Sequence, residues 1–193
     1  MKLQNISVHL FLLLFFFISM GLWADPLSVD FNSHVSRGMR LESNLSLVGD
    51  ISYDTIDAIR NGITAKFNLT VQLHEGGGIF GGTKKLIDQK SKVFTISFDV
   101  WENRFIVNDR RRREDHYVNI SSQLLAKINE VMNPFVLSLP DEYRRMEFRM
   151  RAKIKIQTIK LYPPFGIFLL FFDPWNYESN WIDSDIFMIE ELR

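Results

Sequence analysis

Alternation of apolar and polar residues in four stretches is the feature that most limits how this chain can fold. Side chains of a β-strand point to opposite faces in turn, so alternation places one face in a core and the other in solvent. We predict strands over residues 39–47, 63–73, 94–100 and 146–156. After Glu102 and Asn103 the chain returns over residues 104–107 as the second arm of a hairpin. The phase of the fourth stretch slips at Thr158 and Ile159, which predicts a β-bulge there.

Two helices are expected between these strands. Ser52 can cap a helix over residues 53–61, which Asn61 and Gly62 would end. A second helix begins at Ser121 or Ser122 and ends before Pro134. Long strands with one polar face imply antiparallel sheet with helices packed on it or closing its ends. We therefore predict an α+β fold, predominantly antiparallel β, with a β-sandwich-like sheet and two short helices.

The N-terminal residues have the pattern of a secretory signal peptide. Lys2 precedes an apolar run over residues 10–18 that is short for a membrane span, and Ala24 is the small residue that a signal peptidase needs. We predict a signal peptide over residues 1–24 and one β-rich exported domain over residues 25–193; an uncleaved anchor is the alternative. The chain has no Cys, which favours a bacterial periplasm or cell envelope over a eukaryotic secreted scaffold.

Composition and motifs exclude several classes of function. The chain carries 23 basic and 23 acidic residues, so we predict no nucleic-acid partner. In the glycine-rich segment Thr83 precedes Lys84, the reverse of a phosphate loop, so we predict no nucleotide. We predict no catalytic, metal-binding or cofactor-binding residues and no cofactor, although Asp99, Glu102 and Asp109 could meet as a carboxylate pair.

Several segments resemble, in their order, a bacterial exported family catalogued as domain of unknown function 4390. They are the sequences over residues 58–63, 94–107 and 149–154, followed by Trp175, Ser179 and Trp181. The resemblance implies export and a β-rich fold over most of the chain, and it implies no reaction. The glycine-rich segment over residues 74–83 departs from the Arg- and aromatic-rich segment expected of that family.

Basic residues are concentrated in two places. Four arginines follow the hairpin, and four basic residues share one face of the fourth strand because they are spaced by two. We predict that both bind an anionic surface or an acidic partner. The alternative is that acidic residues of the C-terminal tail fold back and neutralise them, or that they protect a sheet edge. The candidate anion-binding residues are Arg110, Arg111, Arg112, Arg113, Arg149, Arg151, Lys153 and Lys155, and the tail acids are Asp173, Glu178, Asp183, Asp185, Glu190 and Glu191.

An apolar run bracketed by prolines follows the fourth strand. It is too short to cross a membrane, and it is either a strand buried on both faces or an exposed loop that contacts lipid or a partner. The candidate membrane or partner contacts are Phe165, Ile167, Phe168, Leu169, Leu170, Phe171, Phe172 and Trp175.

These features predict a non-enzymatic, exported binding or assembly module of the bacterial cell envelope. Its expected partner is an envelope protein or an anionic membrane surface. Two alternatives belong to other classes: a carrier that encloses a lipid or another apolar ligand, and a hydrolase of an envelope polymer that uses paired carboxylates.

Overall fold

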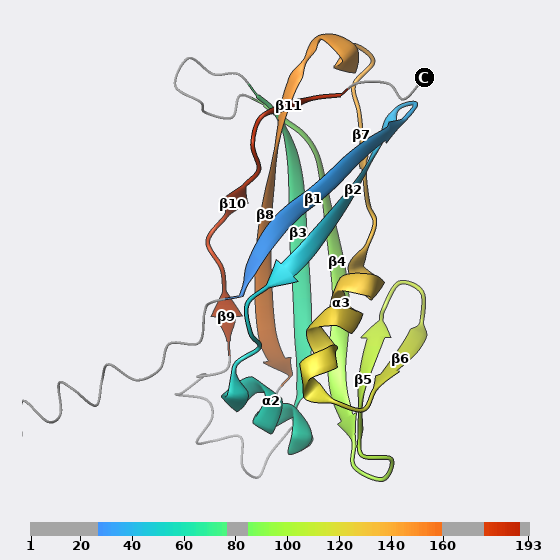
Figure 1. Cartoon of the computed structure of the whole chain (residues 1–193), viewed down its shortest axis with the longest axis vertical. Helices are drawn as coiled ribbons and strands as arrows, with labels where there is room; N and C mark the ends of the chain where they lie inside the picture. Colours follow the sequence, from blue (N-terminus) through green and yellow to red (C-terminus); the bar gives the residue numbers. More distant parts are fainter. Residues whose placement is uncertain (1–26, 77–84, 160–175, 190–193) are drawn as a thin grey trace, which may run out of the picture.

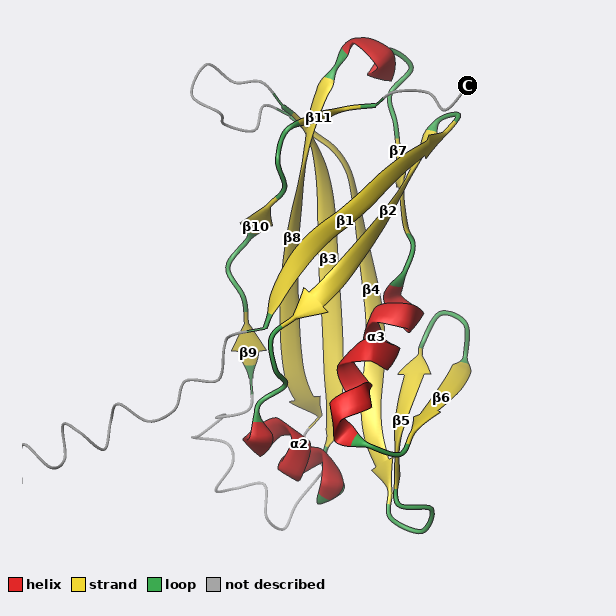
Figure 2. Ribbon diagram, viewed as in Figure 1, coloured by secondary structure: helices red, strands yellow, loops and turns green. Residues whose placement is uncertain are grey.

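The computed structural model describes residues 27–76, 85–159 and 176–189. Two antiparallel sheets face each other, and two α-helices complete the second layer and close one end (Figures 1 and 2). The predicted α+β, sandwich-like fold is confirmed. The predicted signal peptide, residues 1–24, lies outside these ranges and stays a prediction.

The larger sheet has the strand order β10-β8-β3-β4-β5-β6, with β9 and β11 also pairing with β8. Its strands are β3 (Thr64–Glu75), β4 (Leu86–Asp99), β5 (Arg104–Asp109), β6 (Glu114–Val118), β8 (Glu147–Ile159), β9 (Tyr177–Glu178), β10 (Ile182–Asp183) and β11 (Phe187–Met188). The smaller sheet has the order β1-β2-β7, from β1 (Ser28–Arg37), β2 (Arg40–Val48) and β7 (Phe135–Ser138).

The helical elements lie where the sequence places them. Helix α2 (Tyr53–Arg60) begins after Ser52, whose hydroxyl accepts a hydrogen bond from the Thr55 N–H, and Gly62 follows with a φ of 89°. The 3-10 helix η1 (Ser121–Gln123) leads into α3 (Leu124–Met132), and a second 3-10 turn, η2 (Tyr143–Arg145), precedes β8. Both helices were predicted, and only the first turn of the second is 3-10 rather than α.

Strand β8 corrects one prediction. It pairs with β3 in unbroken register from Thr64 opposite Ile159 to Glu75 opposite Phe148, so the bulge expected at Thr158 and Ile159 is wrong. The ladder of hydrogen bonds with β3 overrides the local change of pattern, because a central strand pairs along its whole length.

The core lies between the two sheets. Alternate side chains of β3 are fully buried there, among them Phe67, Leu69 and Leu73, and those of β8 match them. The second layer contributes Leu41, Leu45 and other side chains from β2, β7 and α3. Apolar side chains of both layers therefore pack into one hydrophobic core.

Helix α3 takes the place of a strand beside β2. The first half of β2 pairs with β7, over Arg40 to Ser43. Along the second half, the Asn133 amide accepts from the Leu45 N–H at 2.9 Å and donates to the Leu45 carbonyl at 2.6 Å. The Asn129 amide makes the same pair of bonds with Leu47, at 2.8 and 3.2 Å. Two side-chain amides thus satisfy backbone groups that would otherwise be unpaired.

Removing one of these amides should destabilise the fold. We expect Asn133→Ala to lower the free energy of unfolding by about 2 kcal/mol, because an unsatisfied buried backbone group costs roughly 1–3 kcal/mol. Urea denaturation followed by circular dichroism measures this. Asn44→Ala is the matched control: its side chain is exposed and bonds Ser33, so the change should stay within about 0.5 kcal/mol. Equal losses in the two variants would contradict this role of Asn133.

Candidate functional site

The arginine run forms the turn between β5 and β6. The Asp109 carboxylate accepts hydrogen bonds from the backbone N–H groups of Arg111, at 2.8 Å, and Arg112, at 3.4 Å. Arg113 closes the turn with a φ of 57°. Asp109 is 9% exposed and lies opposite Phe94 in the sheet, on the face toward the core. This buried carboxylate folds the turn so that two of its arginines lie beside the inner face of β4.

These two arginines line a hollow of about 300 Å³ together with Lys90 and Lys92 of β4. We call it the cationic hollow; its other lining residues are Val93, Asp109, Pro134, Phe135 and Val136. Four cations line it with one carboxylate, that of Asp109, which lies 3.9 Å from the Arg112 guanidinium. Lys90 also pairs, at 3.4 Å, with Asp88, which is not among the lining residues. The cationic hollow therefore carries an excess of positive charge.

Lys92 is held in place by the end of α3. Its ammonium donates to the carbonyls of Met132, at 2.6 Å, and Pro134, at 3.0 Å, and lies 5.1 Å from the centre of the Phe135 ring. An ammonium has three N–H groups, and these carbonyls are its hydrogen-bond acceptors among the described residues. Burial, and after it the charge of Arg112, lowers the pKa of Lys92, against the opposing effect of Asp109. A bound anion would relieve this crowding of positive charge.

Asp88, the partner of Lys90, links two strands near the cationic hollow. Its carboxylate accepts from the Ser138 N–H at 2.7 Å and so joins β4 to β7. Burial acts to raise its pKa, but hydrogen bonds from the Ser138 and Gln89 N–H groups, together with Lys90, lower it overall. Asp88 therefore stays ionised while serving as a structural link.

The basic residues of β8 have partners within the chain. Arg151 pairs with Asp183, whereas Lys153 and Lys155 both pair with Glu178, the latter at 3.2 Å. These acids belong to β10 and β9. The pairing of these strands with β8 sets Asp183 opposite Arg151 and Glu178 opposite Lys155. Hydrogen bonds from Lys153 and then Lys155 lower the pKa of Glu178.

The Trp181 ring lies 5.7 Å from both Arg151 and Lys153. Arg149 is half-buried on the same face. The neutralising tail that the sequence left open is thus found at Glu178 and Asp183, while Asp173, Glu190 and Glu191 lie outside the described residues.

The carboxylates considered for a hydrolase lie at two places. Asp99 caps the β4–β5 turn through the N–H groups of Trp101 and Glu102, at 3.1 and 3.2 Å. Asp99 and Asp109 lie at opposite ends of the β4–β5 pairing, opposite Arg104 and Phe94. Each therefore organises its own turn. Among the described residues no cluster of three or more His, Asp or Glu side chains could hold a metal ion.

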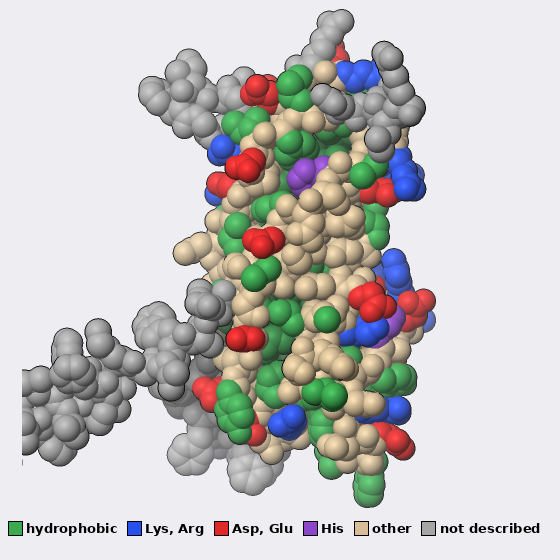
Figure 3. Space-filling view, viewed as in Figure 1, with side chains coloured by type: hydrophobic (Ala, Val, Ile, Leu, Met, Phe, Trp, Pro, Cys, Tyr) green, Lys and Arg blue, Asp and Glu red, His purple; other side chains and the backbone are tan. Residues whose placement is uncertain are grey.

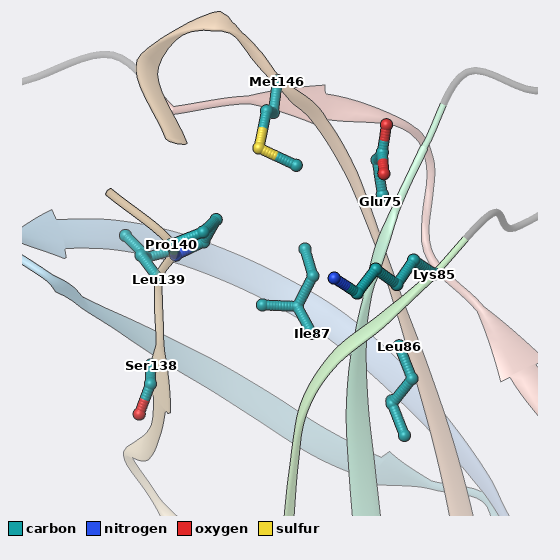
Figure 4. Close-up of a pocket in the computed structure, with 8 residues that line it drawn as sticks. All are labelled: Glu75, Lys85, Leu86, Ile87, Ser138, Leu139, Pro140 and Met146. Carbon is teal, nitrogen blue, oxygen red and sulfur yellow. The ribbon is translucent and has the colours of Figure 1, made fainter. Parts of the chain in front are cut away.

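A second hollow, of about 310 Å³, lies where β3 ends and β4 begins (Figure 4). Met146, Leu139 and Pro140 face Ile87 and Lys85 across it. It mixes one carboxylate, of Glu75, and one ammonium, of Lys85, with an apolar wall. These hollows lie at the surface and do not test whether the protein encloses a lipid or another apolar ligand, so the carrier alternative stays a prediction.

The other predicted residues are placed as follows. Arg110 and Arg113 are exposed on the β5–β6 turn. The apolar run, from Phe165 to Phe172, and Trp175 lie outside the described residues. No described helix is long and apolar enough to span a membrane.

Sequence reasoning missed Lys90 and Lys92. They are spaced by two and continue the alternation of Phe94, and this is the signal that places them on the inner face of β4.

The family model for a domain of unknown function, DUF4390, matches residues 26–185. The chain belongs to the DUF4390 family. The matched range of this DUF4390 chain contains all residues that line the cationic hollow, and also Glu178 and Asp183, which pair with β8. Neither a curated protein nor a solved structure matches it.

The pairing of β8 with the tail predicts a latent anionic-ligand surface. We expect Glu178→Gln/Asp183→Asn to elute from immobilised heparin at higher salt than the unmodified protein, because the variant frees the charges of Arg151, Lys153 and Lys155. Asp54→Asn/Glu102→Gln changes the net charge equally at exposed carboxylates elsewhere. Identical elution of the two variants would show that net charge alone controls the interaction.

Proposed function

We propose that this DUF4390 protein is a non-enzymatic binding module of the bacterial cell envelope that holds an acidic segment of a partner protein in the cationic hollow. The observation that carries the proposal is the fold of the arginine turn, which Asp109 directs toward Lys90 and Lys92. Export to the envelope is supported by the signal-peptide pattern of residues 1–24 and by the absence of Cys.

Charge concentration supports an anionic ligand. The tail acids balance the basic residues of β8, whereas the hollow brings Arg111 and Arg112 to the two lysines of β4. Guanidinium groups donate in a fork that matches a carboxylate, and charge-assisted hydrogen bonds are stronger than neutral ones. Acidic side chains are therefore the complementary ligand.

The walls of the cationic hollow support a peptide as the bearer of these acids. Pro134, Phe135 and Val136 line it, and they belong to or adjoin β7, the edge strand of the smaller sheet. Val136 is 39% exposed. An apolar wall beside fixed cations suits a segment that alternates acidic and apolar side chains.

Fluorescence anisotropy with a labelled hexaglutamate peptide tests the proposal. At low salt we expect Arg111→Gln/Arg112→Gln to weaken binding by about tenfold, since ion pairs contribute roughly 0.2–1 kcal/mol each and tenfold corresponds to about 1.4 kcal/mol. Salt should weaken binding to the unmodified protein, because the contact is electrostatic.

Arg110→Gln/Arg113→Gln is the matched control. It removes the same charge from the same turn, but neither residue lines the cationic hollow. We expect this control to retain most of the affinity. Equal weakening in both double variants, or hexaglutamate binding that neither changes, would overturn the proposed site.

A further inference from the structure

Four exposed apolar side chains gather at one end of the molecule. Trp101 is 97% exposed, Tyr53 77%, Val100 68% and Ile120 54%. We call these four residues the apolar tip. Figure 3 shows hydrophobic side chains at the lower end of the molecule, where Figure 1 places α2 and the β4–β5 turn. Large apolar side chains exposed together mark a contact surface.

The fold brings the apolar tip together from three segments. Tyr53 begins α2, Val100 and Trp101 form the β4–β5 turn, and Ile120 follows β6. A hollow of about 460 Å³ lined by Tyr53, Arg60 and Ser121 joins α2 to the residue after Ile120. Arg60 also lies over the Phe105 ring, next to the β4–β5 turn, at 5.7 Å.

Trp101 is held outward by a defined turn. The N–H groups of Trp101 and Glu102 both donate to the Asp99 carboxylate, and Asn103 completes the turn with a φ of 50°. The turn therefore presents the indole to its surroundings at the extreme end of the sheet. Trp and Tyr are the residues enriched at membrane–water interfaces, because a ring can enter the apolar region while its polar group stays hydrated.

The chain outside the described residues leaves from this half of the molecule. The Tyr177 hydroxyl donates to the Leu27 carbonyl at 2.8 Å, so the preceding 26 residues connect beside β9. Ile159 pairs with Thr64, and Tyr177 with Ile156, so residues 160–175 also connect at the end of β8 nearest α2. Both connections carry strongly apolar sequence, over residues 10–18 and 165–172.

Reach is compatible with a shared contact. In the alternative in which the N-terminal segment stays as an uncleaved anchor, the nine residue steps from Ile18 to Leu27 can span up to about 30 Å when extended. We infer that the apolar tip rests on the lipid surface of a membrane, with the long axis of the larger sheet directed away from that surface. This inference is independent of the proposed acidic partner, because the cationic hollow lies at the other end of β5.

Charge at the apolar tip indicates which lipids matter. Asp50, Asp54 and Glu102 are exposed around it, against Arg60. An acidic rim gains nothing from anionic lipid, so insertion of the aromatic side chains supplies the attraction. We therefore expect contact with zwitterionic lipid that persists at high salt.

Depth-dependent quenching tests the orientation. Because the chain has no Cys, Trp101→Cys in the full-length protein gives a single site for a polarity-sensitive nitrobenzoxadiazole label. In phosphatidylcholine vesicles at high salt, we expect doxyl-labelled lipid to quench this label several-fold more strongly than one at Met39→Cys. Met39 lies in the β1–β2 turn at the opposite end and is 43% exposed. A label at Tyr53→Cys should be quenched like that at Trp101→Cys.

The comparison stays informative when the N-terminal segment anchors the chain, because both labelled proteins share that anchor. Circular dichroism establishes that each labelled variant is folded. Equal quenching at Trp101→Cys and Met39→Cys would overturn the inference, as would no quenching at either site. A blue shift of the label's emission that increases with protein concentration, without quenching by doxyl lipid, would also overturn the inference. That result would assign the apolar tip to contact between copies of the protein.

Discussion

Pairing of β3 along both edges is the constraint on which the rest of the structure depends. The strand bonds β4 on one side and β8 on the other over nearly its whole length. Five alternate side chains, Ala65, Phe67, Leu69, Val71 and Leu73, are fully buried on one face. A row of apolar side chains of that length needs a second layer to cover it. The smaller sheet and α3 supply that layer.

The position of the cationic hollow follows from how that second layer is assembled. Along β2 the layer changes from β7 to α3, and the helix ends at this junction with carbonyls that lack helical partners. Lys92 extends from the inner face of β4 and donates to the carbonyl of Met132, the last residue of α3. A cation at a helix C-terminus is favoured by the helix dipole as well. The same interaction that closes the core thus places positive charge at its margin.

The sequence predicts those parts of the fold whose alternation is regular and local. β2, β3, β5 and β8 alternate cleanly, α2 has a Ser52 cap, and α3 has apolar residues at helical spacing that end before Pro134, so these elements are found. β1 escapes detection because its register shifts between Phe31 and Ser33, which breaks the phase of its apolar side chains. The first half of β4 escapes because charged residues such as Asp88 and Lys92 occupy its inward positions. Their partners, Ser138 and Met132, are about 40 to 50 residues away in sequence.

The sites are harder to predict than the fold for the same reason. The basic residues of β8 stand out in sequence, yet their acidic partners come from the tail through strand pairing. Arg111 and Arg112 stand out as well, but nothing local shows that Asp109 turns them toward β4. Trp101 follows a regular alternating stretch, so its full exposure becomes evident only when the β4–β5 turn is placed at the end of the sheet.

Distance along β5 separates the two surfaces and bears on what each can contact. Asp99 and Asp109 mark the ends of the β4–β5 pairing, with Arg104 to Asp109 between the apolar tip and the cationic hollow. Five residue steps of a strand span about 17 Å. The Debye length at physiological ionic strength is about 8 Å, so lipid charge at the apolar tip is largely screened at the cationic hollow. A sheet standing on a membrane would therefore present the excess positive charge of the cationic hollow to acidic groups of another protein rather than to the lipid beneath it.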